Sequence, residues 1–260
     1  MAMNSPFGDV APPFWQGGPD PSGYYQFPHA NRVNSSQAVA PNTRSQYPIT
    51  VGTSVFGLKY KDGVIIAADT VRNYGGLYGP QYPYLERIKK INETTVYASS
   101  GDNADFKYLH KIIENKQKPV EWRPESLYHW LTRVVYNRRS KFDPLWNTII
   151  IGGFQDGKPF LGCVDHIGTI FKENAVATGV GAAMAIPIIN RELKKYENST
   201  DNLNFKQAKE IMMKCLRLSN MGDNTYKFHI SVINKNGTKV IGPLDIDSKW
   251  EVAKMIFHSK

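Results

Sequence analysis

A regular hydrophobic pattern begins late in this chain. Up to about Tyr47 the residues are mainly Pro, Gly, Asn, Ser and scattered aromatics, without the period of a helix or a strand. Residues 53–60 and 64–69 are then two runs of strand-forming residues joined by Lys-Asp-Gly, and Asp-Gly is a turn pair that tolerates positive φ. The pattern predicts a β-hairpin that opens the folded domain at Thr53.

Further along the chain, groups of strands alternate with pairs of helices. We expect an irregular loop over residues 70–87, and helical periodicity covers 102–118 and 124–140, the second with Pro124 at its first position. The remaining predicted elements are strands around 88–91, 96–100, 148–152, 160–164 and 169–171, helices over 182–196 and 205–218, a hairpin of 228–233 and 238–241, and a short tail helix around 250–256.

This order predicts the fold class. Antiparallel strand blocks that alternate with helix pairs argue against a parallel βαβ fold. They favour an α+β protein in which two antiparallel sheets stack face to face and a helix pair covers each outer side. We therefore expect a four-layer αββα sandwich.

The composition excludes some classes of protein. The chain has 260 residues and two cysteines, Cys163 and Cys215, a usage that fits a reducing compartment with free thiols. We find neither a signal-peptide pattern nor a run of about 18 apolar residues, so we expect no membrane anchor.

The net charge of +9 does not by itself indicate a nucleic-acid binder. Such proteins gather basic residues on one stripe together with stacking aromatics. Here the basic clusters lie on different predicted elements: Lys89-Lys90, Arg138-Arg139-Lys141 and Lys194-Lys195. We expect solvated faces or contacts with acidic protein neighbours, and no nucleic-acid partner.

Candidate chemistry is limited to one constellation. The six histidines show no metal-ligand spacing, and neither a GxSxG motif nor a dinucleotide loop occurs, so we expect no metal and no cofactor. What remains is Gly52-Thr53, Asp69 and Arg87. An N-terminal threonine nucleophile needs a free α-amine as base, a nearby cation and a carboxylate that holds the cation. The alternative is a strand-start threonine, a strand-end aspartate and a surface arginine.

A family resemblance bears on this choice. Gly-Val-Ile-Ile-Ala-Ala-Asp at 63–69, Ser100-Gly101-Asp102 and Ala177-Thr178-Gly179 resemble segments of proteasome β-type subunits. The stretch 136–147, Tyr-Asn-Arg-Arg-Ser-Lys-Phe-Asp-Pro-Leu-Trp-Asn, is similar to the signature of the seventh β position of the eukaryotic ring. The resemblance runs from about Ser45 to the C-terminus. It implies the N-terminal-nucleophile hydrolase fold, which is the αββα sandwich already expected.

The resemblance also implies an incomplete catalytic set. Active β subunits carry a threonine, an aspartate and a lysine, with a serine in a supporting turn and a later aspartate with a serine partner. At those positions this chain has Thr53, Asp69, Arg87, Val180 and Asp223. An arginine cannot shuttle a proton as a lysine with a depressed pKa can. Residues 224–226 do not reproduce the last serine.

The resemblance further implies a cut upstream of the threonine. The segment that starts at Ser45 aligns with the mature start of the resembled subunit, so the cut would follow Arg44, with Thr43 as the less favoured start. Residues 1–44 would then be a flexible propeptide that is removed, 45–52 an N-terminal extension and 53–260 a single domain. The nitrogen of Thr53 would be an amide, which has no basic lone pair. These features favour a non-catalytic structural and assembly subunit over an active threonine endopeptidase cut at Gly52-Thr53.

The implied partners are other proteasome subunits. Helices 102–118 and 124–140 would face the α ring, and helices 182–196 and 205–218 the opposite β ring, with further β subunits beside the chain in its own ring. The interface residues would be Arg138, Arg139, Lys141 and Trp146, although the basic run also fits a solvated helix end or a loop anchor, and Trp146 also fits core packing. The resemblance implies a location in cytoplasm and nucleus.

Overall fold

Most of the predicted domain is described by the structure. The computed structural model describes residues 50–52, 54–74, 81–82, 85–117, 121–179, 181–219 and 227–245. All of them lie within one compact unit, Tyr47–Lys260. The predicted tail helix around residues 250–256 lies outside the described residues.

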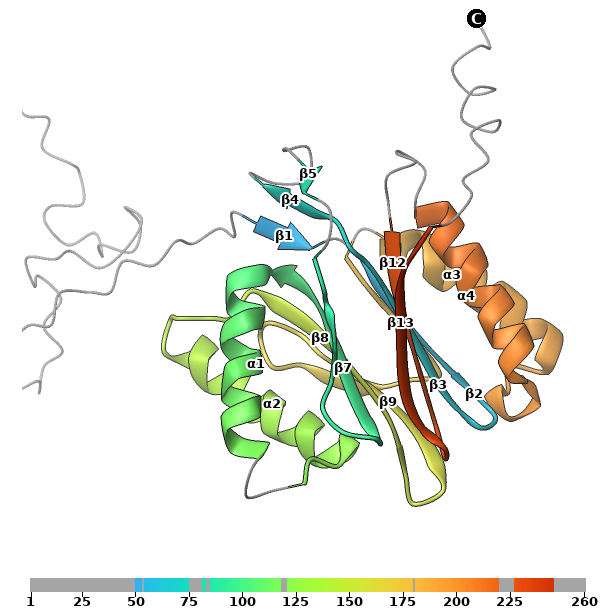
Figure 1. Ribbon diagram of the computed structural model, residues 1–260, viewed down its shortest axis with the longest axis horizontal. Coiled ribbons are helices and arrows are strands. Elements are labelled where there is room, and N and C mark those ends of the chain that lie inside the picture. Colours follow the sequence, from blue (N-terminus) through green and yellow to red (C-terminus); the bar gives the residue numbers. More distant parts are fainter. Residues whose placement is uncertain are drawn as a thin grey trace, which may run out of the picture. The chain divides into compact units, whose positions relative to one another are not determined.

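Two antiparallel sheets form the centre of this unit (Figure 1). The larger sheet has the order β10-β9-β8-β7-β1-β4-β5, with β6 paired to β7. Its strands are β1 (Thr50–Gly52), β4 (Arg72–Tyr74), β5 (Gln81–Tyr82), β6 (Ile88–Lys90), β7 (Thr95–Asp102), β8 (Asn147–Gln155), β9 (Lys158–Val164) and β10 (Ile170–Lys172). The smaller sheet has the order β11-β2-β3-β12-β13. Its strands are β2 (Val55–Tyr60), β3 (Gly63–Asp69), β11 (Ala175–Thr178), β12 (Lys227–Asn234) and β13 (Gly237–Asp245).

A pair of helices covers the outer face of each sheet. The helices are α1 (Asn103–Gln117), α2 (Pro124–Ser140), α3 (Gly181–Leu193) and α4 (Phe205–Ser219), with 3₁₀ turns η4 (Lys194–Tyr196) and η5 (Thr200–Asn202). Figure 1 shows α1 and α2 against the larger sheet, and α3 and α4 against the smaller one. The predicted αββα sandwich is confirmed.

The apolar run of β3 explains why the fold has four layers. Every residue of this strand is buried, because both faces of the smaller sheet are covered. Val64 and Ile66 belong to the hydrophobic cluster between the two sheets, whereas Ile65 and Ala67 belong to the cluster under α3 and α4. A strand buried on both faces reads as a continuous hydrophobic run rather than an alternating one.

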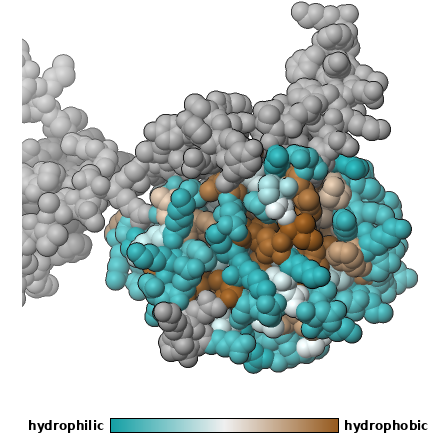
Figure 2. Space-filling view, viewed as in Figure 1, coloured by the Kyte–Doolittle hydropathy of each residue, from teal (hydrophilic) through white to brown (hydrophobic). Residues whose placement is uncertain are grey.

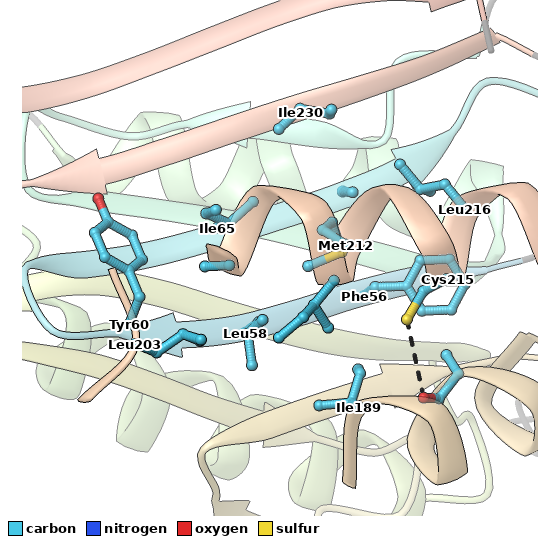
Figure 3. Close-up of a cluster of buried hydrophobic side chains, with 14 of the residues drawn as sticks. Phe56, Leu58, Tyr60, Ile65, Ile189, Leu203, Met212, Cys215, Leu216 and Ile230 are labelled. Carbon is cyan, nitrogen blue, oxygen red and sulfur yellow. Dashed lines mark hydrogen bonds between the residues drawn. The ribbon is translucent and has the colours of Figure 1, made fainter. Parts of the chain in front are cut away.

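The cluster under α3 and α4 joins the helix pair to the sheet (Figure 3). Phe56 on β2 packs with Ile189 of α3 and Met212 of α4. Between the two helices, the Cys215 thiol donates a hydrogen bond to the Ala185 carbonyl at 3.9 Å. Cys163 is also free and buried, in the other cluster between the sheets. Each large apolar side chain buried in this way contributes about 1.5–3 kcal/mol.

The structure corrects several predicted boundaries. The segment 70–87 is not wholly a loop, because β4 and β5 lie within it. β1 and β11 were not predicted as strands, and α3 ends at Leu193, after which the chain continues as a 3₁₀ turn to Tyr196. These strands have two to four residues, too few to display a hydrophobic period.

Candidate functional site

The chain just before residue 53 is an internal strand of the larger sheet. Within β1, Gly52 is opposite Gly101 of β7 on one side and Arg72 of β4 on the other. The sheet order also shows that β4 and β5 join the rest of the sheet through β1. Residue 53 itself, the predicted nucleophile position, lies outside the described residues, as do Arg44, Ser45, Val180 and Asp223.

Asp69 and Arg87, the other two predicted site residues, are in direct contact. The Arg87 side chain is 2% exposed, and its Nη2 forms an ion pair with Asp69 Oδ1. The same nitrogen donates to the Ser54 carbonyl at 3.1 Å, and Nε donates to the Asp69 carbonyl at 3.1 Å. The second carboxylate oxygen, Asp69 Oδ2, accepts a hydrogen bond from the Ser54 backbone N–H at 3.1 Å. Ser54, Asp69 and Arg87 thus form one hydrogen-bonded network.

The order of the strands brings these residues together. Asp69 is the last residue of β3 and Ser54 directly precedes β2, and the antiparallel pairing places Val55 opposite Ala68. Arg87 directly precedes β6, which pairs with β7 of the other sheet. The Arg87 side chain therefore spans from the larger sheet to the end of the β2–β3 hairpin.

The environment of Arg87 keeps its guanidinium protonated and holds the side chain in one position. Burial lowers the pKa of Arg87 to about 9, which still leaves the guanidinium protonated at neutral pH. The adjacent Asp69 carboxylate favours the charged form as well. Of its three nitrogens, Nη1 alone has no hydrogen-bond partner in the part of the chain that the structure describes. A side chain held in this way can position neighbouring groups, but it is poorly suited to accept and return a proton at neutral pH.

Ser54 also fixes the start of α3. Its Oγ accepts a hydrogen bond from the Gly181 N–H at 3.0 Å, which satisfies one of the free donors at the helix N-terminus. A side chain at Gly181 would not fit, since a Cβ there would lie 2.7 Å from Phe56 Cζ and from Ser54 Oγ. Sequence reasoning did not assign Ser54 or Gly181 to the site. The one sequence feature that could have pointed to Ser54 was its position directly after Thr53.

The four predicted interface residues fall into two groups in the structure. Arg138 is held by an ion pair with Asp143 at 2.7 Å and lies over the Tyr108 ring, with its Cζ 5.4 Å from the ring centroid. Trp146 is half-buried and stacks on His166, with 5.7 Å between ring centroids. Arg139 and Lys141 are exposed. Arg138 and Trp146 therefore contact other side chains around the end of α2, whereas Arg139 and Lys141 are open to solvent.

The described residues contain neither a metal-ion cluster nor a membrane-spanning helix. Within the described residues, no group of three or more His, Cys, Asp or Glu side chains is arranged to hold a metal ion. Among the helices of those same residues, none has the length and apolar character needed to cross a membrane.

The fold and this site define the class of the protein. Two stacked antiparallel sheets between helix pairs constitute the N-terminal-nucleophile hydrolase fold. The family model described as "Proteasome subunit" matches residues 49–233. The chain belongs to the proteasome subunit family.

Individual relatives agree with this assignment. The chain is similar to proteasome subunit beta type-4 of Xenopus laevis, with 38% identity over 218 residues that cover 80% of this chain and 88% of the relative. It is 31% identical to proteasome subunit beta type-4 of Drosophila melanogaster over 98% of this chain and 99% of the relative. It is also 32% identical to proteasome subunit beta type-7 of Saccharomyces cerevisiae, covering 94% of this chain and 96% of the relative.

Proposed function

We propose that this chain is a non-catalytic β-type subunit of the proteasome core particle, with a structural role in its assembly. The observation that carries the proposal is the buried Ser54–Asp69–Arg87 network. At the position where the active family members have a lysine, this chain has an arginine whose Nη2 and Nε are committed to an ion pair and two backbone carbonyls. A group fixed in this way holds the β2–β3 hairpin and does not serve as a proton shuttle.

The strand pairing of β1 supports the same proposal. A threonine nucleophile in this fold needs a free α-amine, so the bond between Gly52 and Thr53 must be cut. Residues 50–52 are hydrogen-bonded to β4 on one side and to β7 on the other. An uncut bond keeps this three-stranded connection intact and leaves the nitrogen of Thr53 as a non-basic amide. We propose that the mature chain starts at Ser45, so that 45–52 remain as an extension and 1–44 are removed.

The place in the particle is part of the proposal. The relatives are named beta type-4 and beta type-7, and the stretch 136–147 resembles the signature of the seventh β position. In that position α1 and α2 would face the α ring, and α3 and α4 the opposite β ring, with β subunits alongside. The particle would act in cytoplasm and nucleus.

Exposed apolar surface supports assembly with other subunits. β13 is an edge strand of the smaller sheet, and three of its apolar side chains, Val240, Ile241 and Leu244, are 36–47% exposed. Figure 2 shows hydrophobic side chains gathered on the face that β13 crosses. An exposed edge strand with apolar side chains is a surface that a monomer would ordinarily protect.

The second candidate is an active threonine endopeptidase subunit, favoured by the intact Gly52-Thr53 pair. The mature N-terminus separates the two. Core particles are purified through a tag on another subunit, and the intact mass of this chain is measured. A mass that corresponds to a start at Ser45 is expected, whereas a start at Thr53 would overturn the non-catalytic assignment.

A substitution gives an independent test. We expect Thr53→Ala to leave every peptidase activity of the purified particle unchanged, because residue 53 carries no free amine. The same substitution at the nucleophile of a catalytic subunit in the same particle is the control and should abolish one activity. Loss of one activity in the Thr53→Ala particle would contradict the proposal.

A further inference from the structure

The turn between α2 and β8 presents an aromatic side chain to solvent. Phe142 is 93% exposed, the most exposed large hydrophobic residue of the part of the chain that the structure describes. The turn lies at the outer edge of the helix layer formed by α1 and α2 (Figure 1). A phenylalanine in this environment contributes no burial energy to the fold of its own chain.

The backbone at this position would suit a glycine better. α2 ends in a Schellman motif, in which the Asp143 N–H donates to the Arg138 carbonyl and the Phe142 N–H donates to the Arg139 carbonyl, each at 3.1 Å. The residue after the cap must be left-handed, and Phe142 has φ 56°. Glycine adopts this conformation without penalty, whereas other residues are strained there. Neither burial nor the turn therefore explains a phenylalanine at 142.

The residues that precede Phe142 in the sequence combine an exposed aromatic ring with positive charges that have no ion-pair partner among the described residues. Tyr136 is 56% exposed, and the Arg139 guanidinium lies over its ring, with Cζ 5.9 Å from the ring centroid. Asp143 is occupied by its ion pair with Arg138. Among the described residues, neither Arg139 nor Lys141 takes part in an ion pair. The turn thus offers one protruding ring beside two positive charges.

We propose that Phe142 is the anchor of a protein–protein contact, inserted into an apolar pocket of a neighbouring subunit whose rim carries carboxylates that face Arg139 and Lys141. This rests on the proposed function, which supplies the neighbour. Aromatic and arginine side chains dominate the energetic centre of protein interfaces. The Schellman hydrogen bonds hold the turn in one conformation, so that little entropy is lost when the ring binds. A single-stranded nucleic acid would instead require a groove of cations and several stacking rings.

The test uses two opposite effects of one substitution. Phe142→Gly removes the anchor and also relieves the left-handed strain, so the thermal midpoint of the full chain should rise by roughly 2–4 °C. In cells that also express the wild-type chain, incorporation of this variant into core particles purified through another subunit should fall roughly tenfold or more. Phe142→Met is the matched control: it keeps an apolar side chain and the same strain, and should be incorporated like the wild type.

Charge reversal tests the rim. In the same cells Lys141→Glu should lower incorporation, because its carboxylate would face the carboxylates of the rim. Lys141→Gln is its control and should give a smaller loss, because it removes a charge without introducing repulsion.

Each outcome decides between the proposals. A wild-type chain that is absent from the particles would refute the proposed function. A wild-type chain and a Phe142→Gly chain that are incorporated equally would overturn the Phe142 inference alone. If Phe142→Gly folds poorly, Phe142→Asn replaces it, since Asn also tolerates the left-handed region. A stable dimer of the isolated chain that Phe142→Gly disperses would assign the pocket to a second copy and also overturn the inference.

Discussion

Replacement of Arg87 by methionine should destabilise the domain strongly. Arg87 is buried and provides the cation that the structure places against Asp69, which is itself 6% exposed. Removing one partner of a buried ion pair costs about 3–5 kcal/mol, because a charge then remains in a poorly solvating environment. For a domain of this size, such a loss corresponds to a decrease in Tm on the order of 10 °C.

A double variant separates charge from packing. In Asp69→Asn/Arg87→Met neither charge of the pair remains, while an amide oxygen at residue 69 can still accept the hydrogen bond from the Ser54 N–H. We expect the double variant to recover about 2 kcal/mol or more relative to Arg87→Met, because replacing both partners leaves no unpaired charge at this site. Arg87→Lys serves as the control for charge alone: it keeps a cation but loses the planar fork that reaches both the Asp69 and Ser54 carbonyls.

The measurement is urea unfolding of the full chain at pH 7, for the wild type, both single variants and the double variant. From these four values a double-mutant cycle gives the interaction energy between residues 69 and 87. An interaction energy below about 0.5 kcal/mol would refute the reasoning. It would mean that Arg87 acts as a space-filling side chain and that its charge is not matched to Asp69.

Two other predictions concern pH and backbone conformation. Burial lowers the pKa of both His110 and His229 below 6.5, so the unfolded chain takes up protons first as the pH falls. The free energy of unfolding should therefore decrease from pH 7 to pH 5, and a His110→Gln/His229→Gln variant should show a flatter profile; equal slopes would contradict this origin. Gly101→Ala should prevent proper folding, because φ is +99° and a Cβ would lie 2.1 Å from the Trp146 carbonyl oxygen. The matched control is Gly157→Ala, with φ +75° and no atom within 4 Å of the Cβ, where only the left-handed strain of about 1–2 kcal/mol applies. Similar solubility of the two alanine variants would show that the close approach to Trp146 does not matter.

The elements predicted well from sequence are those whose own side chains define them. β3 is a fully buried run, and α2 has Pro124 at its start and repeats apolar residues at helical spacing, so both were evident without the structure. β1, β4 and β5 are different, because hydrogen bonds to neighbouring strands make them strands. Two or three residues carry no pattern that reveals such a partner.

The candidate site also depends on contacts between distant parts of the chain, which the sequence does not reveal. A comparison with family segments aligned Asp69 and Arg87, but the sequence could not show that the two side chains touch, since the position of Arg87 depends on how the chain between 70 and 87 folds. The bond from the Gly181 N–H to Ser54 Oγ joins two residues that are 127 positions apart. This contact arises because β11 pairs with β2, with Thr178 opposite Val55, and local sequence contains no record of that pairing.

The strand order of the smaller sheet also constrains how the chain can fold while it is being synthesised. β2 and β3 form a local hairpin, but the outer edge of β2 pairs with β11 and the outer edge of β3 pairs with β12. At about 5–20 residues per second, β12 leaves the ribosome on the order of ten seconds after β3. Until β11, α3 and α4 have been synthesised, this hairpin has two open edges and no helix cover, and the edge of β3 stays open until β12 follows. Strands with open edges are the ones that associate with the wrong partner. The nascent chain is therefore at its most vulnerable to aggregation after its first hairpin has formed and before its last one is complete.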